Sequence, residues 1–193
     1  MELAGGKKKI KDKIGRSDIF NAKQIEIADI PVEFIQRHDG LRLVSIGKIL
    51  QALEGCACPM GVLNREFLKK LQLDANTIAL VDMEAGVEHF GRGIDEGIDN
   101  LLLMVEPSFE SLEIADRIQK LAAGMQKSVA AVLSKVPSTE IAERLKEKLR
   151  DRGINVIGTL PSDPLVFEAG FIGHGLKEGP AFNAAGEVLD ALL

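Results

Sequence analysis

Two short segments of the chain contain side chains that could do chemistry. Cys56 and Cys58 are separated by a single residue in Gly-Cys-Ala-Cys-Pro-Met. Further along, an apolar run ends in Asp82, and Glu84 and Gly86 follow it. Thiolates bind soft and borderline metal ions, whereas a carboxylate at the end of a buried strand can hold a magnesium ion beside a bound nucleotide. The first segment therefore suggests metal binding and the second suggests a phosphate-binding site.

The cysteine pair cannot form a complete metal site within one chain. Two thiolates at this spacing can occupy two positions of a tetrahedral site, and the three histidines, His38, His89 and His174, are not spaced as obvious local partners. A two-fold homodimer would supply four sulfurs by bringing two pairs together. The alternative is that both residues are buried structural cysteines without a metal, because Cys is among the most buried residue types.

Asp82 also allows two interpretations. In an open parallel sheet, ligands bind beyond the carboxyl ends of the strands, so a strand ending at Asp82 would present its carboxylate there. Gly86 would let the backbone approach a phosphate closely, since it has no side chain. Alternatively, an Asp in this position caps a helix or forms a turn. Glu84, Glu88 and His89 could belong to a functional switch or to the ordinary surface.

The elements expected to position these residues alternate along the chain from residue 41 onward. Apolar runs predict strands at residues 41–46, 77–82, 101–106, 129–134 and 155–158, and helical patterns occupy residues 63–73, 108–123, 138–152 and 180–193. These runs are nearly all apolar, as expected when helices cover both faces of a parallel sheet. The predicted fold class is α/β, a mostly parallel sheet with helices on both faces, in one domain spanning residues 1–193.

Composition limits the possible partners and the location. The net charge is −5 and the chain has no Trp or Tyr, so we expect no nucleic-acid partner. No apolar stretch approaches the roughly 18 residues needed to span a bilayer, so we expect no membrane insertion. A disulfide between Cys56 and Cys58 would be strained, which favours free thiols in a reducing compartment. The expected location is the cytoplasm.

Three segments together resemble one family. They are Gly-Cys-Ala-Cys-Pro at 55–59, Val-Asp-Met-Glu-Ala-Gly-Val-Glu-His-Phe-Gly-Arg-Gly at 81–93, and Val-Glu-Pro-Ser at 105–108. This combination resembles the nickel-insertion accessory ATPases of carbon monoxide dehydrogenase (CooC type), which belong to the MinD/ParA-like P-loop group. The resemblance extends from about Asp29 through the turn at Pro161 and Asp163 into the last helix. It implies the P-loop NTPase fold and an ATP-dependent metallochaperone.

The resemblance also implies roles for individual residues on the phosphate and metal sides. Asp82 would hold magnesium through water, while Glu84 and Gly86 would complete the catalytic group beside the terminal phosphate of ATP. Cys56 and Cys58 would bind zinc or nickel at a homodimer interface. The implied client is a nickel enzyme such as carbon monoxide dehydrogenase.

On the base side, the resemblance points to four further residues. Pro161 and Asp163 would border the base pocket. Ser134 and Lys135 stand where the family uses an Asn to read adenine. Asn offers both a donor and an acceptor to the base edge, whereas Ser offers only a hydroxyl group.

The chain departs from the family pattern in one further respect, because its 193 residues contain no G-x-x-x-x-G-K-[ST] phosphate loop. We therefore expect the family fold without its first strand and phosphate loop, and ATP hydrolysis near background. The strands at 77–82 and 101–106 should then pair directly, or flank a strand from 41–46 or from a second chain. Two alternative functions are a non-enzymatic Cys-x-Cys metal-binding dimer and a MinD/ParA-like positioning ATPase.

Overall fold

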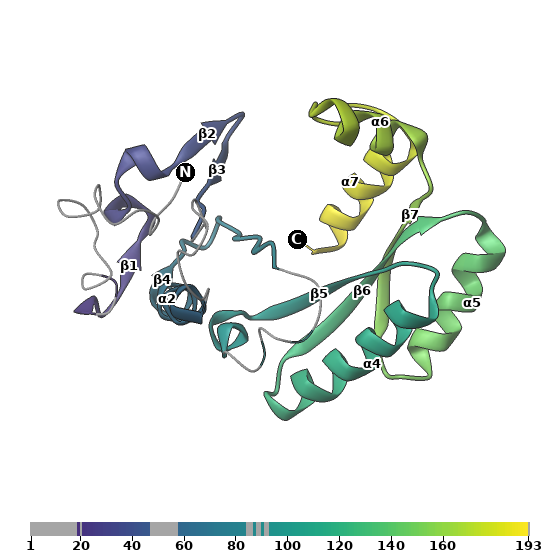
Figure 1. The fold of residues 1–193 in the computed structure, drawn as a ribbon, viewed down its shortest axis with the longest axis horizontal. Coiled ribbons are helices and arrows are strands. Elements are labelled where there is room, and N and C mark those ends of the chain that lie inside the picture. Colours follow the sequence, from purple (N-terminus) through teal and green to yellow (C-terminus); the bar gives the residue numbers. More distant parts are fainter. Residues whose placement is uncertain are drawn as a thin grey trace. The chain divides into compact units, whose positions relative to one another are not determined.

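The structure is a computed structural model, and it describes residue 19 and residues 21–46, 58–83, 87, 90 and 93–192. The chain divides into two compact units, Met1–Ile98 and Asp99–Leu193, and each has its own hydrophobic core. Figure 1 labels the elements of both units. The organisation of residues 1–193 as one domain stays a prediction.

The first unit is built around helix α2 (Cys58–Lys70) and several short strands. β1 (Ile25–Glu26) pairs in parallel with β4 (Leu71–Gln72), and β2 (Gln36–His38) pairs antiparallel with β3 (Leu41–Leu43). The described part of the unit also contains the 3-10 turns η1 (Ile27–Asp29), η2 (Val32–Phe34) and η3 (Ile94–Gly97). The core of the unit forms where apolar side chains of α2 pack against apolar side chains of the segments that precede it. It consists of Ile19, Ile25, Ile30, Ile35, Leu63, Phe67 and Leu68.

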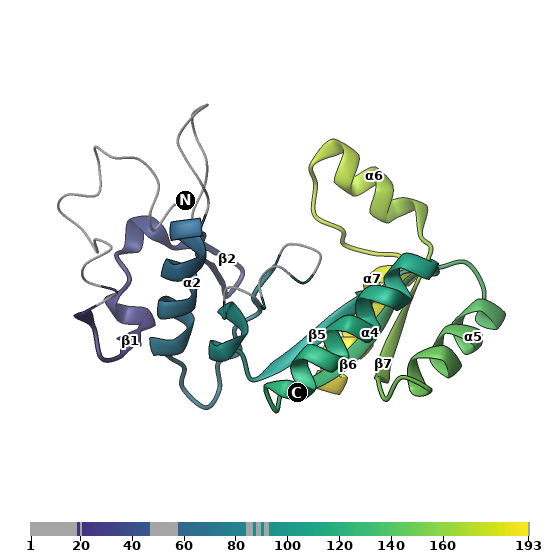
Figure 2. The ribbon, with the colours of Figure 1, turned by 60° about the horizontal axis from the view of Figure 1, so that its bottom comes forward.

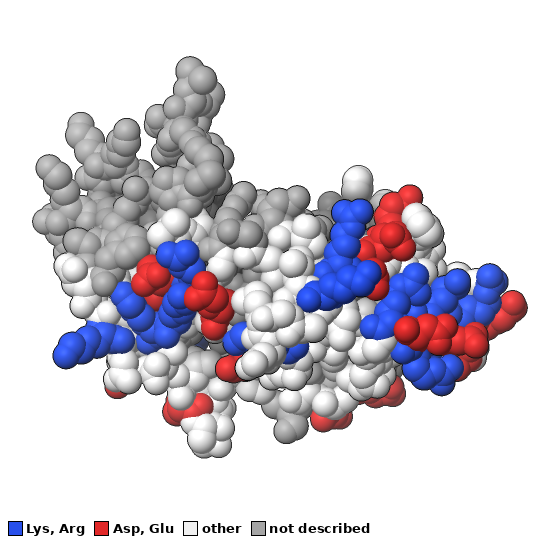
Figure 3. All heavy atoms as spheres, turned by 90° about the horizontal axis from the view of Figure 1, so that it is seen from below, with Lys and Arg blue, Asp and Glu red and all other residues white. Residues whose placement is uncertain are grey.

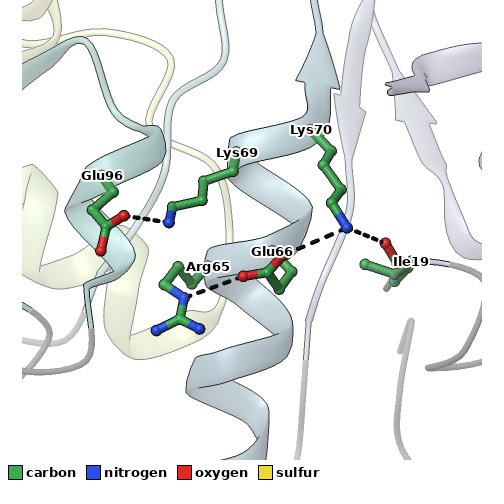
Figure 4. A network of polar contacts seen from close by, with 6 residues as sticks. All are labelled: Ile19, Arg65, Glu66, Lys69, Lys70 and Glu96. Carbon is green, nitrogen blue, oxygen red and sulfur yellow. Dashed lines mark hydrogen bonds and ion pairs between the residues drawn. The ribbon is translucent and has the colours of Figure 1, made fainter. Parts of the chain in front are cut away.

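Charged contacts tie the C-terminal turns of α2 to its neighbours (Figure 4). Lys70 Nζ donates a hydrogen bond to the carbonyl oxygen of Ile19 at 2.9 Å and lies 3.5 Å from Glu66 Oε2. Lys69 forms an ion pair with Glu96 of η3. The two lysines therefore link α2 to segments that precede and follow it in the chain.

The predicted strand at residues 77–82 is wrong. Residues 77–83 have no regular secondary structure, and Ile78 and Leu80 are 55% and 78% exposed. A strand exists only where its backbone groups pair with a neighbour, and among the described strands none pairs with this segment. The expected pairing of residues 77–82 with 101–106 is likewise not formed. An apolar run is therefore not sufficient to form a strand.

The prediction that residues 41–46 form a strand of the parallel sheet is also wrong. Only β3 forms in this range as part of a paired sheet, and its residues are exposed. Asp39 and Gly40 both have positive φ, +47° and +81°, and they turn the chain back onto β2. An Asp-Gly pair with this backbone connects two hairpin strands, so β3 pairs antiparallel with β2 instead of entering a parallel sheet.

The second unit is a three-stranded parallel sheet covered by helices, in the strand order β5 (Asn100–Val105), β6 (Ser128–Val136), β7 (Asn155–Pro161). Figure 1 shows α4 (Phe109–Gly124) and α5 (Thr139–Arg150) on one face of the sheet and α7 (Pro180–Leu192) on the other. This confirms the predicted α/β class with helices on both faces, and the strands predicted at 101–106, 129–134 and 155–158. The short helix α6 (Pro164–Ile172) was not predicted.

Helices α4, α5 and α7 begin at or within one residue of the positions that the sequence predicts. Ser108 and Ser138 accept hydrogen bonds from the backbone N–H groups of Ser111 and Ile141, at 3.1 and 3.3 Å, and so cap α4 and α5. The core lies between these helices and the sheet and consists mainly of Val105, Leu112, Ala115, Ala131, Leu133, Val136, Leu145, Leu149 and Ile154.

The surface charges of the second unit are paired locally. Lys120 of α4 lies 2.6 Å from Asp116, and Lys146 of α5 lies 2.8 Å from Glu143. On the face seen in Figure 3, Lys and Arg side chains are interspersed with Asp and Glu. Within the described residues, no helix is long and apolar enough to cross a membrane.

Candidate functional site

The four predicted base-side residues lie at one edge of the second unit. β5, β6 and β7 run in parallel, so their carboxyl ends meet at the same edge of the sheet. Ser134 and Lys135 lie near the end of β6, while Pro161 ends β7 and Asp163 follows two residues later. The structure therefore places these four residues at the carboxyl edge, where open α/β sheets bind their ligands.

A β-bulge shapes this edge at the end of β6. Leu133 pairs with Thr159 and Val136 with Pro161, so β6 advances three residues (133 to 136) where β7 advances two (159 to 161). The extra residue leaves Lys135 in the left-handed region, with a φ of +54°. A residue other than glycine occupies that region at a cost of roughly 1–2 kcal/mol, and such strain is often found at functional sites.

An ion pair spans the ends of two strands at this edge. Lys135 Nζ lies 2.6 Å from Oε1 of Glu106, the residue directly after β5. The two side chains are 68% and 48% exposed, so the pair adds little stability. Glu106 was not among the predicted site residues. The sequence feature that could have identified Glu106 is an acidic residue immediately after an apolar strand, which is the same feature that drew attention to Asp82.

Asp163 organises the chain beyond β7. Its side chain is buried, with Oδ1 accepting from the Leu165 N–H at 2.9 Å and Oδ2 from the Ala181 N–H at 3.0 Å. The carboxylate thus caps α6 and anchors the start of α7. Gly179 has a φ of +112°, and a Cβ there would lie 2.7 Å from Asp163 Oδ2. Asp163 therefore fixes the starts of these two segments relative to each other.

A pocket of about 370 Å³ opens beside the ends of β6 and β7. Pockets that bind small molecules have volumes of about 300–1,000 Å³, so this one is at the small end of that range. Its lining comes from the β6–α5 connection, the first turns of α5 and the end of β7: Val136, Pro137, Ser138, Thr139, Ala142, Glu143, Lys146, Thr159 and Pro161.

The residues predicted for the phosphate and metal sides belong to the first unit. Asp82 is exposed. Cys58 begins α2, but its side chain lies outside the part of the structure that is described. Glu84, Gly86 and Cys56 lie outside the described residues, so the roles predicted for them remain predictions.

Comparison with known proteins identifies relatives of the chain. An uncharacterized ATP-binding protein of Methanocaldococcus jannaschii is 34% identical over 182 residues, which cover 92% of this chain and 72% of the relative. A second such protein of the same organism is 37% identical over 139 residues, covering 71% of the chain. The carbon monoxide dehydrogenase accessory protein CooC of Rhodospirillum rubrum is 32% identical over 141 residues, covering 72% of the chain. No protein-family model matches the chain.

The length of these relatives differs from that of the chain. The alignments cover 54% of the second M. jannaschii protein and 53% of CooC. The chain thus spans about half the length of these two relatives and 72% of the length of the first M. jannaschii protein.

Proposed function

The chain belongs to the family of ATP-binding proteins that includes CooC, and we propose that it serves an ATP-dependent accessory function in inserting nickel into an enzyme such as carbon monoxide dehydrogenase. The observation that supports this most directly is the carboxyl edge of the second unit. There a strained bulge, an ion-paired lysine and a buried carboxylate lie at the ends of neighbouring parallel strands.

At this edge, the chain would hold the base of the nucleotide. Ser134 offers a hydroxyl group, while Lys135 offers its ammonium group and the backbone of the bulge. Pro161 ends the neighbouring strand, and Asp163 fixes the chain that follows it. These groups bind and orient the base but take no part in phosphoryl transfer.

In the first unit, the segment that begins at Asp82 would supply a magnesium-binding carboxylate. Its exposed carboxylate can hold a magnesium ion through water, and magnesium would neutralise charge on the phosphates of ATP. Gly86 would allow backbone N–H groups to approach the terminal phosphate, and Glu84 would complete this segment.

Cys56 and Cys58 would bind the transported metal. Two thiolates per chain make half of a tetrahedral site, so a homodimer with four thiolates would bind one zinc or nickel ion between its subunits. Free thiols of this kind persist in a reducing compartment, so we propose that the protein acts in the cytoplasm.

Calorimetric titration with ATP and magnesium tests the nucleotide site. We expect Lys135→Ala to weaken binding about tenfold, equivalent to roughly 1.4 kcal/mol. Lys120→Ala is the matched control, because Lys120 also lies 2.6 Å from a carboxylate and is 74% exposed, but it belongs to the part of α4 remote from the carboxyl edge. If the two variants bound ATP and magnesium with equal affinity, the end of β6 would not belong to the nucleotide site.

A second function is favoured by one observation, the Cys-x-Cys pair at Cys56 and Cys58, which supplies two thiolate ligands whether or not a nucleotide is bound. In this case the chain would be a metal-binding dimer that does not use nucleotide. The same titration decides between the two proposals, because a protein that binds nickel or zinc but shows no heat with ATP and magnesium would be of the second kind.

A further inference from the structure

Glu106 lies beside the residues proposed to hold the base of the nucleotide. β5 and β6 pair in parallel up to Val105 and Leu133. The next residues along the two strands are Glu106 and Ser134. The Glu106 carboxylate also reaches Lys135, whose Nζ lies 2.6 Å from Oε1. A hydroxyl group, an ammonium group and a carboxylate therefore gather where these two strands end.

The backbone on both sides of this group is fixed. Figure 2 shows β5, β6 and β7 leading to one end of the unit, from which the chain passes into α4, α5 and α6. The Ser108 N–H donates to the Glu106 carbonyl oxygen at 2.7 Å, and the Ser162 N–H donates to that of Val136 at 2.8 Å. On this fixed backbone the Glu106 side chain is still 48% exposed, so a bound molecule can reach its carboxylate.

The ion pair leaves both side chains able to bind a further group. An ammonium group has three N–H donors, and an ionised carboxylate has two oxygens with about four lone-pair sites. The contact between Lys135 Nζ and Glu106 Oε1 therefore exhausts neither group. The pair presents a donor and an acceptor side by side, and it suits a ligand that itself carries a neighbouring acceptor and donor.

Adenine carries such atoms on one edge. Its exocyclic 6-amino group is a donor and its N7 is an acceptor, whereas in a 6-oxopurine such as guanine both O6 and N7 are acceptors. A carboxylate accepts a hydrogen bond from an amino group, but beside a carbonyl oxygen it faces a second acceptor with no proton to share. Lys135 alone would suit either purine, because an ammonium group can donate to N7 of both.

We propose that Glu106 is a specificity-determining residue of the nucleotide site. Its carboxylate accepts a hydrogen bond from the 6-amino group of adenine, while Lys135 donates to N7. This inference rests on the proposed function, since it requires a nucleotide base at the carboxyl edge of the second unit. The two charged groups then have different roles, because Lys135 holds a purine of either kind and Glu106 rejects one with an oxygen at position 6.

Calorimetric titration of the full chain with ATP and with inosine triphosphate, each with magnesium, tests this role. The two ligands differ in the base alone, where a 6-oxo group replaces the 6-amino group. We expect the native protein to bind ATP at least about tenfold more tightly than inosine triphosphate. Glu106→Gln should reduce this ratio to about threefold or less, because an amide can turn either a donor or an acceptor toward position 6.

The ratio of the two affinities separates recognition from a structural effect. If Glu106 acted only by orienting Lys135, Glu106→Gln would weaken both ligands equally, and the unchanged ratio would overturn the proposal. Glu113→Gln is the matched control and should keep the native ratio. Glu113 is 44% exposed in the same unit, but its partner is Arg152, at a distance of 4.0 Å, which precedes the amino end of β7.

Failure of this inference and failure of the proposed function give different results. A native protein that binds ATP and inosine triphosphate with equal affinity would keep its nucleotide site, and only the role of Glu106 would be overturned. A native protein that binds neither triphosphate would overturn the nucleotide site and the role of Glu106 together.

Discussion

At the scale of single residues, Asp163 shows how much a side chain's role depends on contacts that the sequence does not reveal. Its position after β7 could be predicted from the resemblance, but its two backbone partners could not, because Ala181 lies 18 residues away. We expect Asp163→Ala to lower the free energy of unfolding by about 1–3 kcal/mol, since two N–H groups would lose their acceptor.

Chemical denaturation measures this loss of stability. Asp163→Asn keeps one carbonyl oxygen as an acceptor and should fall between the native protein and Asp163→Ala. Asp190→Ala, at an exposed position of α7, is the control for removing a carboxylate. If both Asp163 variants were as stable as the control, the carboxylate would not be holding α6 and α7 in place.

Gly158 marks the closest approach between β7 and α7. A Cβ at this position would lie 2.3 Å from Val188 Cγ2, well inside van der Waals contact. We expect Gly158→Ala to destabilise the fold by about 1–3 kcal/mol through overpacking, and Val188→Ala in the same chain to recover part of the loss. Gly186→Ala should stabilise the protein slightly, because nothing lies within 4 Å and the residue is inside helix α7. Thermal unfolding of the three variants would check this.

At the scale of elements, the sequence predicts the strands and helices that are stabilised by their own apolar pattern and by contacts with elements nearby in the chain. β5, β6 and β7 are correctly predicted because each is a long apolar run joined to the next by a capped helix. Residues 77–82 show an equally apolar pattern, but a strand requires a partner, and the pattern does not indicate whether one is available. The same holds for the bulge at Lys135, which depends on the register between β6 and β7.

The bulge at Lys135 can be tested through its backbone conformation. Lys135→Gly and Lys135→Ala both remove the ion pair with Glu106, but only glycine adopts a φ of +54° without steric cost. We expect the Gly variant to be more stable than the Ala variant by about 1 kcal/mol. Urea denaturation would measure this difference, provided that the two variants unfold with equal m-values. If the Ala variant were as stable as the Gly variant, the backbone at this position would be unstrained.

The contact between α2 and η3 should depend on pH. The hydrogen bond from Lys69 holds the pKa of Glu96 below its ordinary value of 4.5. A carboxylate with a lowered pKa stabilises the fold above its unfolded-state pKa, so this contribution should be lost as the pH falls below 4.5 through the folded-state value. A carbon-detected NMR titration of the Glu96 carboxyl group should show the lowered midpoint. Lys69→Met should return it toward 4.5, and an unchanged midpoint would exclude Lys69 as the cause.

At the scale of the whole molecule, two kinds of signal in the sequence were informative. The α/β class could be predicted from the alternation of apolar runs and helical patterns, and the relationship to ATP-binding proteins could be recognised from Gly-Cys-Ala-Cys-Pro and the segment after Asp82, which are local motifs. The exposed surface of α6 could not, because its apolar residues would equally suit a buried helix. Whether such residues are buried depends on distant segments of the chain.

The metal-linked contact at Cys56 and Cys58 predicts that zinc or nickel controls the oligomeric state of the protein. Two thiolates per chain fill half of a tetrahedral site, so a homodimer that shares one ion should form when the metal is bound. With zinc or nickel present, we therefore expect dimers that hold one metal ion per two chains. Analytical ultracentrifugation with metal analysis would measure both the mass and the metal content.

Substitution of the two cysteines should remove this contact. Cys56→Ser with Cys58→Ser should abolish metal binding and shift the chain toward monomers, because the ion would no longer link two copies. Unchanged metal content in the variant would remove the cysteines from the site, and a native dimer that keeps its mass in EDTA would show that another surface holds the two subunits together.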